Sequence, residues 1–256
     1  MKVKKIRNLI TKWLTEYSIL NGHKNFVVGI SGGVDSALTS TLCAMTGLKT
    51  FLVSMPIHQK KGELENANKH MKWLSKKYSN VDIIEIELTN LLEQYILTIP
   101  DRFQSELGFA NSRARLRMMT LYQIATKENG LVVGTGNKVE DFGIGFFTKY
   151  GDGGVDISPI ADLTKSEVRN LAKFCEIDKK IIQAAPTDGL WSDGRTDETQ
   201  IGATYTELEW AMDFNSKKKL TKKEQSIITI YNKLHSQNKH KMNPIPICKI
   251  PKTLKS

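Results

Sequence analysis

The sequence predicts an α/β fold in which helices flank a doubly wound, mainly parallel sheet. Four short apolar runs alternate with helical patterns, and this alternation is typical of such folds. Three of the runs are rich in Val and Ile and nearly continuous, as parallel strands covered on both faces tend to be. Distinctive loops follow the first and the last run. Because ligands bind at the carboxyl ends of strands in these sheets, we expect the functional site there.

An amphipathic helix is predicted before the first strand. Its apolar side chains recur at helical spacing and so share one face, formed by Ile6, Leu9, Ile10, Trp13, Leu14 and Tyr17. The expected strands are 26–30, 50–55, 81–87 and 131–135, and the expected helices between them are 36–46, 62–79 and 101–128. Acidic and apolar residues alternate over 81–87, which predicts an edge strand.

Loops and helices are predicted after residue 150. Thr164 and Glu167 have the spacing of a capping box, which predicts the start of a helix. The Gly- and Asp-rich stretch 186–199 predicts a polar loop that closes over the site as a lid. Helices over 198–213 and 221–236 follow, then a proline-broken tail. No linker or repeat divides the sequence, so we expect a single domain over residues 1–256.

Composition indicates a globular protein of the cytoplasm. Hydrophobic residues make up 40% and charged residues 25%, and no apolar run approaches the roughly 18 residues of a membrane span. The basic N-terminal segment has no small-residue cleavage site, so we expect no signal peptide. Cys43, Cys175 and Cys248 lie far apart, as expected of thiols in a reducing compartment. We therefore expect a cytoplasmic protein that does not bind a membrane.

The net charge of +10 is concentrated in one segment. Residues 215–256 contain eleven lysines and a single acid, Glu224, whereas 26 basic and 26 acidic residues balance in the first 214. An excess of this kind is typical of a solvated helix face and a C-terminal arm. A phosphate-rich ligand or an RNA backbone is the alternative. We expect no nucleic-acid partner.

The stretch VVGISGGVDSAL at 27–38 is compatible with two chemistries. It fits Gly-x-Ser-x-Gly, the turn that presents a nucleophilic serine in hydrolases, but Ser31 follows the first strand, so no earlier strand supplies an oxyanion-hole loop. A phosphate cradle fits better, because Gly32 and Gly33 let backbone N–H groups turn toward an anion at a helix N-terminus. Asp35 would repel bare phosphate and suits an Mg²⁺ ion that bridges carboxylate and phosphate.

The SGGVDS segment resembles the pyrophosphatase loop (PP-loop) of ATP pyrophosphatases, which split ATP into AMP and pyrophosphate to adenylylate a substrate. Further segments, in order, resemble NAD synthetases: NSRARLR (111–117), GTGNKVED (134–141), FFTKYGDGGVDISPIADLTKSEV (146–168), PT (186–187), TDETQIGATYTELE (196–209) and HKMNP (240–244). The resemblance covers nearly the whole chain. Only about 25 residues precede the first strand, so it implies the shorter, ammonia-dependent form without a nitrilase-like glutaminase domain.

The resemblance implies a Rossmann-like PP-loop fold and a reaction. The reaction is the ATP-dependent amidation of deamido-NAD (nicotinic acid adenine dinucleotide) with ammonia, the last step of NAD biosynthesis. It gives NAD, AMP and pyrophosphate through an adenylylated carboxylate. A carboxylate oxygen leaves poorly, so adenylylation makes AMP the leaving group, and the protein's task is positioning and charge neutralisation. Mg²⁺ as cofactor, ATP as co-substrate and a homodimer with the substrate site at its interface are also implied.

The resemblance further assigns residues to each ligand. Mg²⁺ would be held by Asp35 and Glu140, with one extra residue here between Glu140 and the FFTK block relative to some family members. The expected ATP contacts are Gly29, Ile30, Ser31, Gly32, Gly33, Val34, Asp35, Ser36, Thr135, Lys165 and Thr187, among which Asp35, Lys165 and Thr187 form the expected catalytic group. The expected deamido-NAD contacts are Arg115, Lys149, Asp156, His240 and Lys241, with Phe146 or Phe147 stacking on the pyridine ring.

Two other interpretations stay open. A tRNA-modifying PP-loop enzyme would suit the basic tail, but the sequence has no paired cysteines for thiolation. A non-catalytic nucleotide-binding protein would have less need of Asp35 and Glu140. The arginines of 113–117 also fit a solvated helix face, on which Arg115 points away from Arg113 and Arg117.

Overall fold

In the computed structural model, residues 1–187, 189–191, 195–215 and 219–255 are described. Within this part of the chain, four strands form one sheet in the order β3-β2-β1-β4, and every neighbouring pair is parallel. The strands are β1 (Asn25–Gly29), β2 (Lys49–Ser54), β3 (Val81–Glu85) and β4 (Gly130–Val132). Strand β3 lies at an edge, which confirms the prediction from its alternating pattern.

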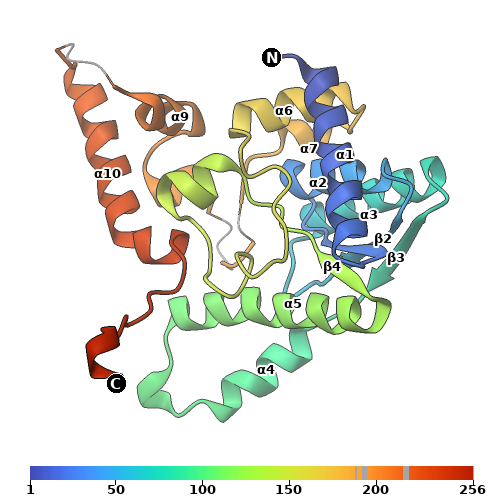
Figure 1. Cartoon of the computed structure of the whole chain (residues 1–256), viewed down its shortest axis with the longest axis horizontal. Coiled ribbons are helices and arrows are strands. Elements are labelled where there is room, and N and C mark those ends of the chain that lie inside the picture. Colours follow the sequence, from blue (N-terminus) through green and yellow to red (C-terminus); the bar gives the residue numbers. More distant parts are fainter. Residues whose placement is uncertain (188, 192–194, 216–218, 256) are drawn as a thin grey trace.

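Helices cover both faces of the sheet (Figure 1). One face packs against α1 (Val3–Leu20), α2 (Val34–Ala44), α3 (Lys61–Lys77) and α6 (Lys165–Phe174), and the other against α4 (Thr89–Thr98) and α5 (Glu106–Glu128). Side chains of β1 alternate between the two cores: Phe26 and Val28 enter the first, and Val27 enters the second. The α/β fold with a sheet flanked by helices is therefore confirmed.

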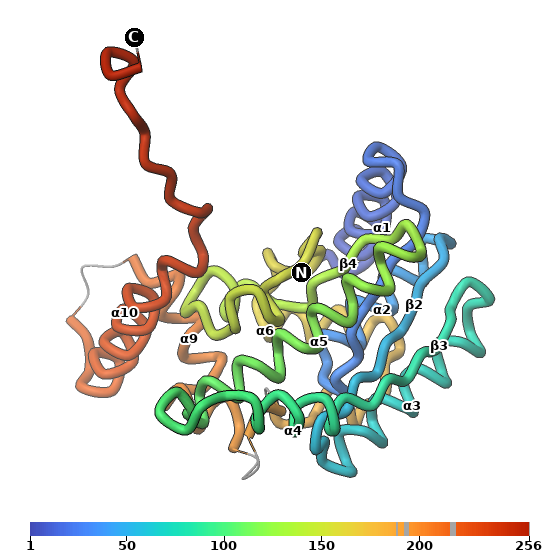
Figure 2. The backbone as a smooth tube through the Cα atoms, turned by 90° about the horizontal axis from the view of Figure 1, so that it is seen from below, coloured from blue at the N-terminus to red at the C-terminus, as the bar shows by residue number. Residues whose placement is uncertain are grey.

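A third layer lies beside the sheet and consists of short segments and two longer helices. It contains η2 (Val139–Ile144), α8 (Asp197–Ile201), α9 (Tyr205–Asp213) and α10 (Lys222–Met242). The short helix α7 (Lys179–Gln183) packs instead with α2 and α6 on the first face of the sheet. Helices α9 and α10 lie side by side, far from β2 and β3 (Figure 2). The segment after α10, with a 3₁₀ turn η3 (Lys252–Leu254), projects from the body as an arm. None of the described helices is long and apolar enough to cross a membrane.

The strand order places the two predicted loops together. From β1 the chain continues to β2 and β3 on one side, while β4 pairs with β1 on the other. The carboxyl ends of β1 and β4 therefore flank the point where the order reverses, which is the usual ligand site of such sheets.

Several predicted boundaries in the first half are wrong. The expected helix 101–128 begins only at Glu106, where Ser105 caps α5, and Asp101–Phe103 forms a separate 3₁₀ turn, η1. Helix α4 has no counterpart among the predicted elements. The predicted face of α1 is also too wide, because Leu9 is 67% and Trp13 40% exposed.

The second half shows one confirmation and two differences. The capping box of Thr164 and Glu167 starts α6 as predicted. The expected helix 198–213 is interrupted at Gly202, whose φ of +83° ends α8. Helix α10 reaches Met242, so His240 and Lys241 belong to its last turn rather than to the tail. The predicted lid 186–199 includes 188 and 192–194, which lie outside the described residues.

Candidate functional site

A cleft opens at the carboxyl ends of β1 and β4, and it brings the predicted ATP contacts together. Its lining includes all of Gly29, Ile30, Ser31, Gly32, Gly33, Val34, Asp35, Ser36, Thr135, Lys165 and Thr187. Glu140, Phe146 and Phe147 line the same cleft. Residues from five separate parts of the chain thus meet as the resemblance implies.

The SGGVDS loop has the conformation of an anion cradle. Gly32 has a φ of +90°, and a Cβ there would lie 2.4 Å from the carbonyl oxygen of Glu63, so this position requires glycine. The hydroxyls of Ser31 and Ser36 are 3.1 Å apart, and the Gly33 N–H donates to Ser31 Oγ at 3.2 Å. These partners tie Ser31 into the loop at the N-terminus of α2, which suits an anion-binding loop better than a nucleophile beside histidine.

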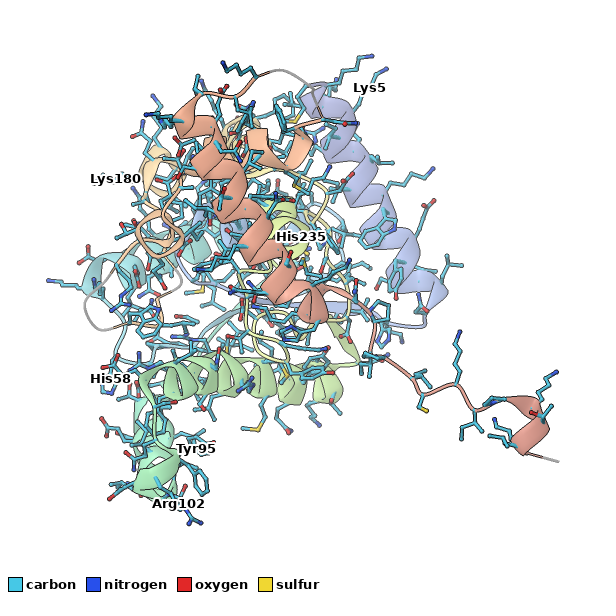
Figure 3. All side chains as sticks on the ribbon, turned by 90° about the vertical axis from the view of Figure 1, so that its left-hand side faces the viewer. Lys5, His58, Tyr95, Arg102, Lys180 and His235 are labelled. Carbon is cyan, nitrogen blue, oxygen red and sulfur yellow. The ribbon has the colours of Figure 1, made fainter. Side chains whose placement is uncertain are left out.

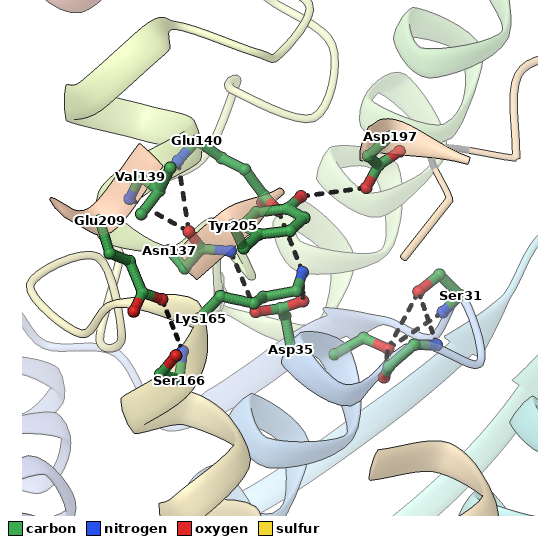
Figure 4. A network of polar contacts seen from close by, with 12 residues as sticks. Ser31, Asp35, Asn137, Val139, Glu140, Lys165, Ser166, Asp197, Tyr205 and Glu209 are labelled. Carbon is green, nitrogen blue, oxygen red and sulfur yellow. Dashed lines mark hydrogen bonds and ion pairs between the residues drawn. The ribbon is translucent and has the colours of Figure 1, made fainter. Parts of the chain in front are cut away.

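An ion cluster fills the floor of the cleft (Figure 4). The ammonium of Lys165 lies 2.6 Å from Asp35 Oδ2 and 3.0 Å from Glu140 Oε1, and Lys165 is only 3% exposed. Burial alone would lower the pKa of Lys165, but the two carboxylates raise it above its ordinary value. The lysine therefore stays charged and pairs with two acids, which come from α2 and η2.

Asn137 connects these two acids and carries no role in the sequence-based assignment. Its side chain is fully buried, and its amide donates to Asp35 Oδ1 at 3.2 Å. Its oxygen accepts from the backbone N–H of Val139 at 3.1 Å and of Glu140 at 3.2 Å. One side chain thus orients the Asp35 carboxylate and caps the turn that carries Glu140.

The turn η2, which carries Glu140, is π-helical. A π-turn holds one residue more than an α-turn, and such turns are frequent at functional sites. Here it spans Val139–Ile144 and is followed by Gly145, whose φ is +62°. The Phe146 N–H donates to the Glu140 carbonyl at 2.9 Å. Glu140 thus reaches Lys165, and Phe146 lines the cleft.

Two more acids line the cleft and were not predicted. A Cβ on Gly136 would lie 2.2 Å from Asp141 Oδ1, so the glycine makes room for this carboxylate. Burial, followed by the charges of Glu140, Asp152 and Asp35, raises the pKa of Asp141 to about 8. Burial also raises the pKa of Asp152 to about 6, although the Thr148 N–H donates to it at 2.9 Å. The raised pKa values reflect burial of several acids close together, and a bound cation would favour their ionised forms.

Asp35 and Glu140, the expected magnesium ligands, lie on either side of one cation. Among the described residues, no three His, Cys, Asp or Glu side chains converge as a complete metal site. Asp35 and Glu140 nevertheless both reach a single cation, the Lys165 ammonium. Mg²⁺ is commonly held by one or two carboxylates together with substrate phosphates and waters. The pair therefore fits a magnesium site that bound ATP would complete.

Four of the five predicted deamido-NAD contacts form a second cluster. Arg115 Nη2 donates to the Lys149 carbonyl at 3.4 Å, and Lys149 Nζ donates to the His240 carbonyl at 3.0 Å. Lys241 Nζ donates to the Phe147 carbonyl at 2.8 Å and lies 5.0 Å from the centre of its ring. The cluster thus joins α5 and the end of α10 next to Phe147, which lines the cleft.

Asp156, the fifth predicted contact, lies apart from this cluster. Its carboxylate accepts from the Tyr122 hydroxyl at 3.0 Å and from the Val132 N–H at 2.8 Å. In this structure Asp156 therefore fastens the loop after residue 154 to β4.

Arg117 is a cleft residue that the sequence-based assignment left out. Its Nε donates to the Met55 carbonyl and its Nη2 to Gln59 Oε1, each at 3.0 Å. Arg113 donates to the Leu190 carbonyl, while Arg115 is exposed on another side of α5. The helical spacing of these arginines had already separated Arg115 from the other two.

Comparisons with known proteins identify similar sequences and folds. A family model described as NAD synthase matches residues 6–244. The NH(3)-dependent NAD(+) synthetase of Alkaliphilus metalliredigens is 37% identical over 254 residues, which cover 96% of this chain and 98% of that protein. The protein of the same name from Methanococcoides burtonii is 42% identical over 192 residues, which cover 73% of this chain and 70% of that protein.

Solved structures with this fold include an NMN synthetase from Francisella tularensis, with a TM-score of 0.87 and 31% identity over 98% of this chain and all of the other. The NH3-dependent NAD synthetase from Campylobacter jejuni, in complex with the nitrate ion, has a TM-score of 0.79 and 28% identity over 97% of this chain and all of the other. Fold, site geometry and sequence similarity together lead to one conclusion. This chain belongs to the NAD synthase family.

Proposed function

We propose that this protein is an NH3-dependent NAD⁺ synthetase, which converts deamido-NAD, ammonia and ATP into NAD⁺, AMP and pyrophosphate. The observation that carries the proposal is the convergence of Asp35, Glu140 and Lys165 beside the SGGVDS loop. The relatives are named NH(3)-dependent NAD(+) synthetases, and ATP-driven amidation would use an anion-binding loop, a metal-ligand pair and a cation in this way.

The proposed reaction has two steps. A carboxylate oxygen of deamido-NAD attacks the α-phosphorus of ATP, and the bond to the β-phosphate oxygen breaks to release pyrophosphate. Ammonia then attacks the acyl carbon, and AMP leaves with the former carboxylate oxygen. The loop N–H groups and the Ser31 and Ser36 hydroxyls would bind the departing pyrophosphate, and Lys165 and Thr187 would contact the phosphates.

Asp35 and Glu140 would hold Mg²⁺. When bound, the ion would neutralise part of the negative charge of the ATP phosphates. For both carboxylates to take that role, Lys165 has to release them. Its ammonium would then be available for a phosphate oxygen in the same cleft. Asp152, whose pKa of about 6 leaves it mostly ionised at neutral pH, would attract an ammonium ion, and a nearby cation would favour ionisation of Asp141 as well.

We further propose a cytoplasmic homodimer. An apolar face on α4, η1 and the start of α5 is exposed and is formed by Leu91, Tyr95, Leu97, Phe103 and Leu107. Tyr95 and Arg102 mark this end of the molecule, opposite Lys5 of α1 (Figure 3). A second copy would cover the face, and Arg115 of α5 would then reach substrate across the interface.

A second candidate is the same amidation of nicotinic acid mononucleotide. The observation that favours it is the similarity to a structure named NMN synthetase, at 31% identity and a TM-score of 0.87. The chemistry at the carboxylate is identical, so only contacts to the rest of the nucleotide would distinguish the two acceptors.

One experiment tests both candidates. Purified protein is given ATP, Mg²⁺, ammonium and either deamido-NAD or nicotinic acid mononucleotide, and all products are quantified. We expect equal amounts of amidated product, AMP and pyrophosphate, with a higher kcat/KM for deamido-NAD. Release of ADP and phosphate would contradict the mechanism, and a preference for the mononucleotide would select the second candidate. Pyrophosphate release that depends on tRNA would assign the protein to the tRNA-modifying enzymes.

A further inference from the structure

Helix α9 contacts the ion cluster at two points. It begins at Tyr205, and the Thr204–Glu207 capping box fixes its first turn. The Tyr205 N–H also donates to Glu198 Oε1 at 2.9 Å. Because Tyr205 and Glu209 are four residues apart, they lie on one face of the helix. That face is turned toward Glu140 and the start of α6 (Figure 4).

Tyr205 contacts both members of one ion pair. Its hydroxyl donates to Glu140 Oε1, the oxygen that Lys165 also binds. The Lys165 ammonium lies 4.6 Å from the centre of the Tyr205 ring, within cation–π distance. Tyr205 is 1% exposed, so neither contact is shared with bulk water.

The Tyr205 hydroxyl lies between two carboxylates. Asp197 Oδ2 lies 3.1 Å from the same oxygen, on the side away from Lys165 (Figure 4). A phenol hydroxyl has one proton to donate, and both acceptors within reach are carboxylate oxygens.

Glu209 holds the other half of the cluster through the backbone. Its Oε1 accepts from the Ser166 N–H at 2.8 Å, in the first turn of α6. Lys165 is the residue immediately before Ser166, so this bond fixes the position from which the lysine side chain extends. One helix thus orients Glu140 through a side chain and Lys165 through both a ring and a backbone bond.

We propose that Tyr205 and Glu209 are positioning residues for metal-assisted ATP binding: α9 holds Glu140 and the base of Lys165 in place while the ammonium moves from the carboxylates to phosphate. This inference rests on the proposed function, because it requires that ATP and Mg²⁺ bind in the cleft. Neither residue touches the reacting atoms. Without α9, Glu140 would follow the lysine, and the metal would lose a prepared ligand.

The test measures binding rather than turnover. Calorimetry gives the affinity for α,β-methylene-ATP, which cannot be cleaved at the reacting bond, with saturating Mg²⁺ and with EDTA. We expect Tyr205→Phe, which keeps the ring, to weaken binding with Mg²⁺ about tenfold and binding in EDTA hardly at all. Tenfold corresponds to about 1.4 kcal/mol, near the lower end for a hydrogen bond to a charged group.

Tyr231→Phe is the matched control, because Tyr231 packs against the same small core of α8–α10 and contacts no member of the ion cluster. Glu209→Ala should also weaken binding with Mg²⁺, whereas Glu209→Gln keeps an acceptor for the Ser166 N–H and should restore it. Equal loss in EDTA and in Mg²⁺, or no rescue by glutamine, would show a merely structural role and overturn the proposal.

Two outcomes separate this inference from the proposed function. If the wild-type protein shows no Mg²⁺-dependent binding of the analogue, the proposed function itself fails. If wild type shows it and Tyr205→Phe binds equally well, only the positioning role fails. Thermal unfolding of each variant checks that it is folded, and if Tyr205→Phe does not fold, the Glu209 pair decides the question.

Discussion

At the scale of single residues, one lysine pairs with two acids of the site. Lys165 lies within 3.0 Å of two carboxylates and is itself almost fully buried. Buried charges are costly unless they are paired, and here each acid has the lysine as a partner. This pairing lets the two acids that we propose as metal ligands lie close together.

Replacing Asp35 by asparagine tests whether its carboxylate is needed for catalysis. Asp35→Asn preserves the shape and the contact with Asn137 but removes one of the two proposed metal ligands. We expect kcat/KM to fall at least about 100-fold, because a metal contact contributes several kcal/mol. The control is Asp82→Asn on β3, whose ion pair with Lys49 is half exposed. Steady-state assays check the loss, and activity within about tenfold of wild type would contradict the metal role.

His70 gives a pH dependence of stability that is independent of the site. Its ring is 2% exposed and lies 2.9 Å from Ser40 Oγ, and burial lowers its pKa from 6.5 to about 4. The unfolded chain therefore binds the proton first as the pH falls, so this group reduces stability below pH 6.5. We expect it to account for about 2 kcal/mol of lost stability between pH 7.5 and pH 5.

Urea unfolding at the two pH values measures this effect in wild type and in His70→Gln. Subtracting the two proteins removes the contributions of other groups, including Asp141, whose raised pKa gives the opposite slope. If the two proteins lose the same stability between these pH values, His70 is not neutral in the fold.

The sequence could identify site residues that belong to a local pattern. Asp35 stands inside a contiguous loop motif, so it could be assigned before any fold was known. Tyr205 lies within the segment 196–209 that resembles NAD synthetases. The sequence alone does not distinguish a functional tyrosine on a helix from one that only packs in the core, and the contact of its hydroxyl with Glu140 makes that distinction. Partners 65 residues apart in sequence meet only through tertiary packing.

At the scale of elements, the buried strands and the helix starts near residues 164 and 221 were predictable because their signals are local. The Thr164–Glu167 capping box starts α6 as expected, and Thr204 and Thr221 start α9 and α10 with the same chemistry. The π-turn η2 was not predictable, since it depends on support from elsewhere. His235 contacts the Gly143 carbonyl at 2.6 Å, and Asn238 donates to the Ile144 carbonyl at 2.8 Å.

Asn137 is expected to be the residue on which η2 depends. Asn137→Ala removes the cap of the turn and leaves the Val139 and Glu140 N–H groups without their acceptor. We expect a loss of about 1–3 kcal/mol in the free energy of unfolding, together with reduced activity. Chemical denaturation checks the loss against Asn8→Ala on the exposed side of α1. Equal free energies of unfolding for the two variants would show that η2 does not depend on Asn137.

At the scale of the whole molecule, the proposed assembly rests on an exposed apolar face. Helix α4 was missing from the predicted elements, and it contributes part of the exposed face that we propose as the dimer interface. A helix whose outer side is covered only by a second copy has apolar residues on both sides. Its sequence therefore lacks the usual contrast between an apolar core side and a polar solvent side. The fold of one chain could therefore be predicted more completely than its assembly.

The dimer is tested by placing charge on that face. We expect wild type to elute at twice 28.9 kDa in size-exclusion chromatography with light scattering. Leu97→Lys combined with Leu107→Lys should give monomers and raise the KM for the nucleotide acceptor, since Arg115 would lose its partner site. Leu20→Lys, on α1, is the control because Leu20 is 84% exposed away from the face. A wild-type monomer with full activity would contradict the proposal.

The position of α9 along the chain also has a consequence during synthesis. The last strand ends at Val132, but Tyr205 follows 73 residues later (205 − 132), and proteins emerge from the ribosome N-terminus first. At about 5–20 residues per second, this interval lasts roughly 4–15 seconds. The SGGVDS loop and all four strands are thus synthesised well before the helix that we propose to position the metal ligands, so the complete site can assemble only late in synthesis.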